Sequence, residues 1–148
     1  MYTTILWATD GSPDADGALE EALALLEPGG KLIAFHCDQR FFGGRANGEP
    51  VRPNEVDLRR HIDAQVMDLR GRGIDVEEHV LTTHGDAAHQ IAEAGERLGV
   101  EVIVTGTRAA HGLTALLDGS VAARLLKHAT VPVIVVPAGV HAARAATV

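Results

Sequence analysis

The sequence predicts an α/β domain in which helices cover both faces of a parallel sheet. Five short apolar runs alternate along the chain with segments whose apolar residues recur at helical spacing. Parallel strands need a crossover connection, and helices of ten or more residues between apolar strands are the usual crossovers. No internal repeat or second domain is visible, and 148 residues with 46% hydrophobic content are sufficient for one core.

The first predicted strand, residues 3–9, runs directly into the first predicted helix. Ser12 is suited to cap this helix and Pro13 to occupy its first position, where a missing N–H is harmless. The run Pro28-Gly29-Gly30 is expected to end it. One face of the helix would be apolar and turned to the core, and it consists of Ala15, Ala18, Leu19, Ala22, Leu23 and Leu26.

The other elements follow from the same patterns. The remaining predicted strands are 31–37, 74–81, 101–106 and 131–136. A helix over about 55–70 would turn inward a stripe made of Leu58, Ile62, Val66 and Leu69. A further helix follows the turn 82–86 and carries Ala88, Ile91, Ala92, Gly95 and Leu98. Glycine and proline breaks make 38–54 the one long flexible segment that the sequence predicts.

A glycine-bearing loop between the last two predicted strands has the character of an anion site. Gly106 ends one strand, and Gly119-Ser120 opens a helix that begins at Val121. The first N–H groups of a helix lack internal partners and lie at the positive end of its dipole, which suits a phosphate. A Walker loop is excluded because its lysine is missing, and a dinucleotide fingerprint fails because Arg108 stands where glycine is required.

Three turns at the carboxyl ends of the predicted strands carry polar residues. They are Ala8-Thr9-Asp10, His36-Cys37-Asp38 and the loop from Gly106 to Ser120. Ligands of open α/β sheets bind outside the carboxyl ends of the strands. A carboxylate at the first turn can accept hydrogen bonds from ribose hydroxyls, while the third turn takes phosphates, so the three turns together outline a nucleotide site.

Composition excludes several classes of function. A net charge of −7 argues against broad electrostatic binding to nucleic acid or to an anionic membrane. The single cysteine forbids an intrachain disulfide, and the sequence shows neither a signal peptide nor an apolar run long enough to span a membrane. The expected location is therefore the cytoplasm.

The segments ATDGS, LIAFHCD, HGDAAHQIAEAGERLGVEVIVTGTR and GLTALLDGSVAARLLKHATVPVIVVP together resemble the universal stress protein family along nearly the whole chain. The resemblance implies a Rossmann-like domain over 1–137, of the adenine nucleotide α-hydrolase type, with strand order 3-2-1-4-5. It also implies a bound adenine nucleotide, ATP with magnesium, as a regulatory or sensing ligand in stress response. The tail 138–148 is small and alanine-rich, and we expect it to be poorly ordered.

The family motif, G-x-x-G followed by nine residues and G-S/T, transfers a binding set to this chain. The residues expected around adenine and ribose are Ala8, Thr9, Asp10 and Cys37. Those expected in the phosphate loop are Gly106, Arg108, Ala109, Gly112, Gly119, Ser120 and Val121. The resemblance further implies a homodimer through the last strand, with contacts from Val131, Val133, Ile134, Val135 and Val136.

One position departs from that motif, because Ala109 stands in place of its second glycine. If the backbone there needs a positive φ, alanine costs roughly 1 kcal/mol of strain, and its methyl group intrudes on the phosphate. Asp118 adds a negative charge beside the loop, which Arg108 would offset. The departure predicts weakened nucleotide binding.

Other interpretations remain open from sequence alone. Asp10-Gly11-Ser12 is also an ordinary turn and helix cap. A second hypothesis is a nucleotide-free dimeric interaction module of the same fold, in which Ala109 marks loss of the ligand while the fold persists. Weak ATP hydrolysis ranks third, and no catalytic residue is assigned, since no lysine, carboxylate or base is visibly aimed at a γ-phosphate. The eight histidines lack the spacing of a metal site, and His36 is expected to pack beneath the exit of its strand.

Overall fold

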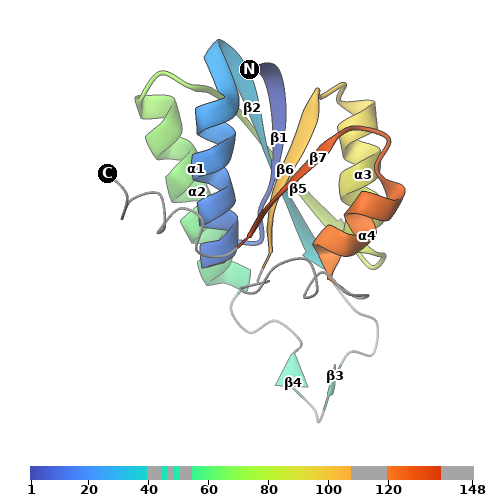
Figure 1. Ribbon diagram of the computed structural model, residues 1–148. Coiled ribbons are helices and arrows are strands. Elements are labelled where there is room, and N and C mark those ends of the chain that lie inside the picture. Colours follow the sequence, from blue (N-terminus) through green and yellow to red (C-terminus); the bar gives the residue numbers. More distant parts are fainter. Residues whose placement is uncertain (40–44, 47–48, 51–54, 108–119, 138–148) are drawn as a thin grey trace.

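The computed structural model describes residues 1–39, 45–46, 49–50, 55–107 and 120–137, and Figure 1 shows its fold. Its main sheet has five strands in the order β5-β2-β1-β6-β7, with every neighbouring pair parallel. In chain order these strands are β1 (Tyr2–Ala8), β2 (Leu26–Gln39), β5 (Asp75–Thr83), β6 (Val102–Thr107) and β7 (Val133–Pro137). The predicted order 3-2-1-4-5 is confirmed.

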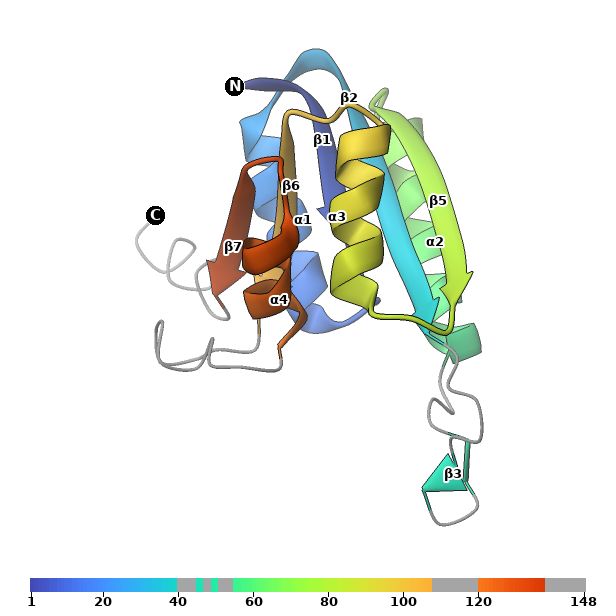
Figure 2. The same cartoon turned by 90° about the vertical axis from the view of Figure 1, so that its right-hand side faces the viewer.

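In the part of the chain that the structure describes, four helices cover the sheet, two on each face (Figures 1 and 2). On one face lie α1 (Pro13–Leu25) and α2 (Glu55–Gly71), and on the other α3 (Ala87–Arg97) and α4 (Val121–His128). Each face has its own apolar cluster. Residues from successive positions of β1 divide between them, with Ile5 and Trp7 in the first cluster and Leu6 and Ala8 in the second, as the two-residue period of a strand requires.

The α1 side of the core is organised around Trp7. Its side chain is fully buried, and its indole Nε1 donates to the carbonyl oxygen of Ala15 at 2.9 Å. A buried indole N–H needs an acceptor, and the first turn of α1 supplies one. The predicted inward residues of α1 are buried at Ala15, Ala18, Leu19 and Ala22, so the helical spacing identified this face correctly.

The predicted boundary between the first helix and the second strand is wrong by several residues. α1 ends at Leu25 and β2 begins at Leu26, so Pro28-Gly29-Gly30 lies inside the strand. There the pairing with β1 is irregular: Tyr2 pairs with Leu26 and Thr4 with Lys31, and Gly29 has φ +81°. The glycines that were expected to stop a helix lie where the register of the strand shifts, and pairing with β1 continues on either side of them.

Other boundaries differ less. The last strand begins at Val133 instead of Val131, and β2 continues through Asp38 and Gln39, which pair with Thr82 and Thr83 of β5. These two residues had been assigned to the flexible segment. Cross-strand pairing to a neighbour that is itself long extends a strand beyond its apolar run.

A short antiparallel pair, β3 (Arg45–Ala46) and β4 (Glu49–Pro50), was not predicted. The other residues of the segment 40–54 and the tail 138–148 lie outside the described residues. Within the described part of the chain, no helix combines the length and the apolar character that crossing a membrane requires.

Candidate functional site

The carboxyl ends of the central strands meet at one edge of the sheet. Ala8, the last residue of β1, pairs with Phe35 of β2 on one side and with Thr105 of β6 on the other. The turn after β1 therefore lies between the ends of β2 and β6. α4 also begins at this end of the sheet, which is the lower end in Figure 2. Three of the chain segments expected to form the site are thus brought to one edge.

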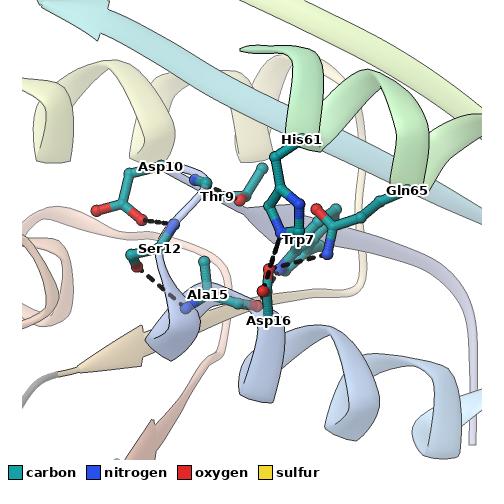
Figure 3. Close-up of polar contacts among 9 residues, drawn as sticks. Trp7, Thr9, Asp10, Ser12, Ala15, Asp16, His61 and Gln65 are labelled. Carbon is teal, nitrogen blue, oxygen red and sulfur yellow. Dashed lines mark hydrogen bonds and ion pairs between the residues drawn. The ribbon is translucent and has the colours of Figure 1, made fainter. Parts of the chain in front are cut away.

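The turn from β1 into α1 is held by its own side chains (Figure 3). The N–H of Gly11 donates to Thr9 Oγ1 at 3.0 Å, and that of Ser12 donates to Asp10 Oδ1 at 3.0 Å. Ser12 caps α1 by accepting from the N–H of Ala15 at 3.3 Å. Thr9 is buried whereas Asp10 is exposed. The ordinary turn-and-cap interpretation of this segment is therefore correct, and the exposed carboxylate still has accepting capacity for another donor.

Gly106 is packed against a helix. A Cβ atom at this position would lie 2.3 Å from the carbonyl oxygen of Asp14 and 3.2 Å from the backbone nitrogen of Ala15. No side chain fits there, so the glycine is required for the close approach of β6 and α1. This packing requirement is separate from the ligand contact that the sequence suggested for Gly106.

Ser120 forms the N-cap of α4. Its Oγ accepts from the N–H of Ala123 at 3.0 Å, and its φ and ψ of −71° and 149° are those of an extended cap residue. One turn into the helix, the guanidinium of Arg124 contacts Asp86 Oδ1 at 3.1 and 3.2 Å. Asp86 in turn caps α3 by accepting from the N–H of Ala88. The starts of α3 and α4 are therefore joined through one carboxylate.

Cys37 and Val121 lie on the opposite side of the sheet from α1. Cys37 is buried in the cluster that contains Ala87 and Ala88, and Val121 packs against the same cluster. The cysteine lies among apolar residues, in keeping with a small buried hydrophobic side chain.

His36 joins the turn after β1 to the start of α2, a contact that sequence reasoning did not identify. The imidazole is buried, as predicted, with Nδ1 2.9 Å from the Thr9 carbonyl oxygen and Nε2 2.6 Å from Glu55 Oε1. The one available signal was a histidine in an otherwise apolar strand, LIAFHC. Its partner is 19 residues away and could not be chosen among the many carboxylates of the chain.

Comparison with known proteins agrees with the fold. The model of the universal stress protein family matches residues 1–137. This chain belongs to the universal stress protein family. Among curated proteins, a search returned no match.

Solved universal stress protein structures superpose on nearly the whole chain. One from Burkholderia pseudomallei has 27% identity and a TM-score of 0.67, covering 93% of this chain and 97% of its own. One from Arabidopsis thaliana with AMP bound has 18% identity and a TM-score of 0.60, covering 95% and 94%. A third, in complex with cAMP, has 20% identity and a TM-score of 0.58, covering 92% and 97%. The last two share the fold with this chain.

In this universal stress protein, the predicted site residues fall into two groups. The structure brings Ala8, Thr9, Asp10, Cys37, Gly106, Ser120 and Val121 to one end of the sheet. Arg108, Ala109, Gly112 and Gly119 lie outside the described residues. Among the residues that are described, no three histidine, cysteine, aspartate or glutamate side chains form a group that could hold a metal ion.

Proposed function

We propose that this universal stress protein binds an adenine nucleotide as a regulatory ligand at the carboxyl edge of its sheet. The observation that carries the proposal is that two complementary groups share this edge. The exposed carboxylate of Asp10 follows β1, and the capped N-terminus of α4 begins at Ser120. The first is an acceptor for ribose hydroxyls, and the second is an attractor for phosphate.

Each of these groups is suited to a different part of the nucleotide, Asp10 to the ribose and the start of α4 to the phosphates. Asp10 uses Oδ1 for its own turn, so Oδ2 is the oxygen assigned to the ribose. Ser120 Oγ accepts from Ala123, and its hydroxyl hydrogen remains to be donated to a phosphate oxygen. Arg124 is held by Asp86, so the positive end of α4, together with Arg108, is assigned the charge of the phosphates.

The relatives support the adenosine part of this proposal most directly. Structures of the same fold have been solved with AMP and with cAMP, which share adenine, ribose and one phosphate. For this chain we propose more specifically that the nucleotide is ATP with magnesium and that the protein acts in the cytoplasmic stress response. No catalytic role is proposed for any residue.

Calorimetry with adenosine and ATP tests the assignment. Asp10→Ala should weaken both ligands equally because it acts at the ribose, whereas Ser120→Ala should weaken ATP far more than adenosine. Ser120→Asp is the matched control for the loss of the cap, since aspartate also caps helices. Its charge should repel ATP while the fold is retained. Mass spectrometry of gently purified protein should detect a retained adenine nucleotide.

A second function, a nucleotide-free dimeric interaction module, is favoured by a different observation. β7 is an edge strand, and Ile134 and Val135 on it are only partly buried. An apolar edge strand offers unpaired backbone groups to a second chain. Absence of measurable binding of adenosine and ATP to the natural protein and to Ala109→Gly would reject the nucleotide proposal and leave this module.

A further inference from the structure

We infer that His36 is a positioning residue of the turn that carries Asp10, and that it acts through one proton shared with Glu55. This inference rests on the proposed function for its consequence on nucleotide binding. Its physical basis, a hydrogen-bonded chain from Thr9 through His36 to Glu55, is independent of any ligand.

The hydrogen bonds of the His36 ring fix a proton count. The Thr9 carbonyl oxygen can only accept, so Nδ1 must carry a hydrogen. Nε2 lies 2.6 Å from Glu55 Oε1, and two bare acceptors at that distance would repel each other. A second proton therefore lies between them, on the imidazole or on the carboxyl group. In either arrangement the pair holds one proton more than a neutral imidazole with a carboxylate.

Burial makes this pair sensitive to the loss of that proton. The side chain of His36 is 1% exposed and that of Glu55 13% exposed, and among the described residues the buried Glu55 Oε2 has no hydrogen-bond partner. Water therefore has little room to separate the two groups or to replace the bond. When the proton leaves, the repulsion between Nε2 and Oε1 forces His36 and the start of α2 apart.

The turn depends on this connection at both of its ends. The N–H of Thr9 donates to the Phe35 carbonyl oxygen at 2.9 Å, while its carbonyl oxygen accepts from His36. Two adjacent residues of β2 thus hold the peptide groups on both sides of Thr9, directly before Asp10. Gly11 packs against Leu58 of α2, since a Cβ atom on it would lie 3.0 Å from Leu58 Cβ. A movement of α2 is therefore transmitted to the turn.

Other ionisable groups surround the pair and must stay constant in a test. Glu78 of β5 lies on the same face of the sheet, and burial raises its pKa, as does its contact with Asp63. The ionisable groups of α2 that interact with Glu78 are Asp63, Arg59 and Arg70, and His61 of α2 is paired with Asp16 of α1. Substitutions restricted to Glu55 leave all of them in place.

Two variants separate the shared proton from the contact itself. In Glu55→Gln, the amide N–H₂ can donate to a neutral His36 Nε2, so the chain of hydrogen bonds survives without the proton shared with a carboxyl group. In Glu55→Ala, the chain of hydrogen bonds is broken at every pH. The measurement is a pH series of NMR spectra of the ligand-free protein, following the His36 ring and the amides of Gly11 and Ser12.

We expect the His36 ring and both amides of the natural protein to change together, in one common step of the pH series. Glu55→Gln should show wild-type-like amide positions and no step, and Glu55→Ala should show displaced, faster-exchanging amides throughout. The inference would be overturned if the Gly11 and Ser12 amide signals of the natural protein did not change with pH, or if Glu55→Gln showed the same step.

The consequence for the site is measured with AMP. The affinity for AMP should fall several-fold across that common step in the natural protein and should not fall in Glu55→Gln. An equal fall in both proteins would overturn the positioning role. If the natural protein binds no AMP at any pH, the proposed function fails, while the amides still decide whether His36 positions the turn.

Discussion

Gly106 of β6 and Asp14 of α1 approach so closely that a Cβ atom on Gly106 would lie 2.3 Å from the Asp14 carbonyl oxygen. Contact between a strand end and the first turn of a helix at this range is open only to glycine. The residue that the nucleotide motif places first in the phosphate loop is thus also required for the packing of α1. Any loss of binding in a Gly106 variant has to be separated from loss of fold.

Gly106→Ala should lower the free energy of unfolding by about 1–3 kcal/mol, because α1 must move to admit the methyl group. Gly17→Ala is the matched control: it lies within α1, and its Cβ would meet nothing within 4 Å. That change should raise stability by about 0.5–1 kcal/mol through helix propensity. Urea unfolding of both variants measures the two changes in stability. An unchanged unfolding midpoint for Gly106→Ala would contradict the packing argument.

Stability should fall in acid through Glu101. Its carboxylate accepts hydrogen bonds from the Thr3 hydroxyl and from the backbone N–H groups of Thr3 and Thr4, which hold its pKa below the ordinary value of 4.5. A depressed folded-state pKa gives stability that is present above the unfolded pKa and is lost as pH falls through the folded pKa. Glu101→Ala should therefore be less stable than the natural protein near neutral pH.

Thermal unfolding over a series of acidic pH values measures that difference, which should shrink as Glu101 of the natural protein becomes protonated. A difference that stays constant with pH would show that the carboxylate charge contributes nothing. Glu101→Gln keeps a neutral acceptor, so its stability near neutral pH should lie between those of the natural protein and Glu101→Ala.

Asp86 should contribute to stability mainly as a helix cap. Asp86→Ala removes the acceptor for Ala88 and the partner of Arg124, and we expect a loss of about 1 kcal/mol, typical of an N-cap. Asp86→Asn keeps the cap and loses the charge. Because the ion pair is partly exposed, the stability of this variant should fall by only a few tenths of a kcal/mol. Chemical denaturation of both variants, of Arg124→Ala and of the double variant Asp86→Ala/Arg124→Ala gives the coupling free energy between Asp86 and Arg124. Equal losses for alanine and asparagine would assign the effect to the ion pair instead.

Restoring glycine at Ala109 should strengthen nucleotide binding. Ala109→Gly removes both the methyl group and the restriction on positive φ, and ATP affinity should rise by about 1 kcal/mol, or about fivefold. Adenosine affinity should stay unchanged, since the loop serves the phosphates. Calorimetry with both ligands measures this, and a gain for adenosine equal to that for ATP would place the effect away from the phosphates.

The proposed dimer should depend on the edge formed by β7. The side chain of Val136 is already buried within the single chain, so only its backbone could contact a second chain. Val135 is partly exposed. Val135→Lys should convert a particle of twice the chain mass into one of single mass by light scattering. Met67→Lys, at a residue 72% exposed on α2, is the control and should leave the mass unchanged. A natural protein of single-chain mass at micromolar concentration would reject the dimer.

Local sequence patterns determined the element order and the inward faces of this protein. The spacing in α1 and α2 identified Ala18, Ile62 and Val66 as core residues, and all three are buried. Ser12 and Ser120 were identified as helix starts because caps act on amides two or three residues away. These features depend on near neighbours in the chain, so the sequence alone carries them. The strand order came with the family resemblance.

Tertiary structure decided the features that depend on distant partners. β2 starts at Leu26 because Tyr2 pairs with it, and Gly106 must be glycine because the backbone of α1 lies against it. His36 selected Glu55 among many carboxylates because the β2 exit and the start of α2 meet only in the folded chain. Buried hydrogen-bonding groups must find partners in space. The pattern of the sequence shows that such a group is buried, and only the packing of the elements decides which partner it finds.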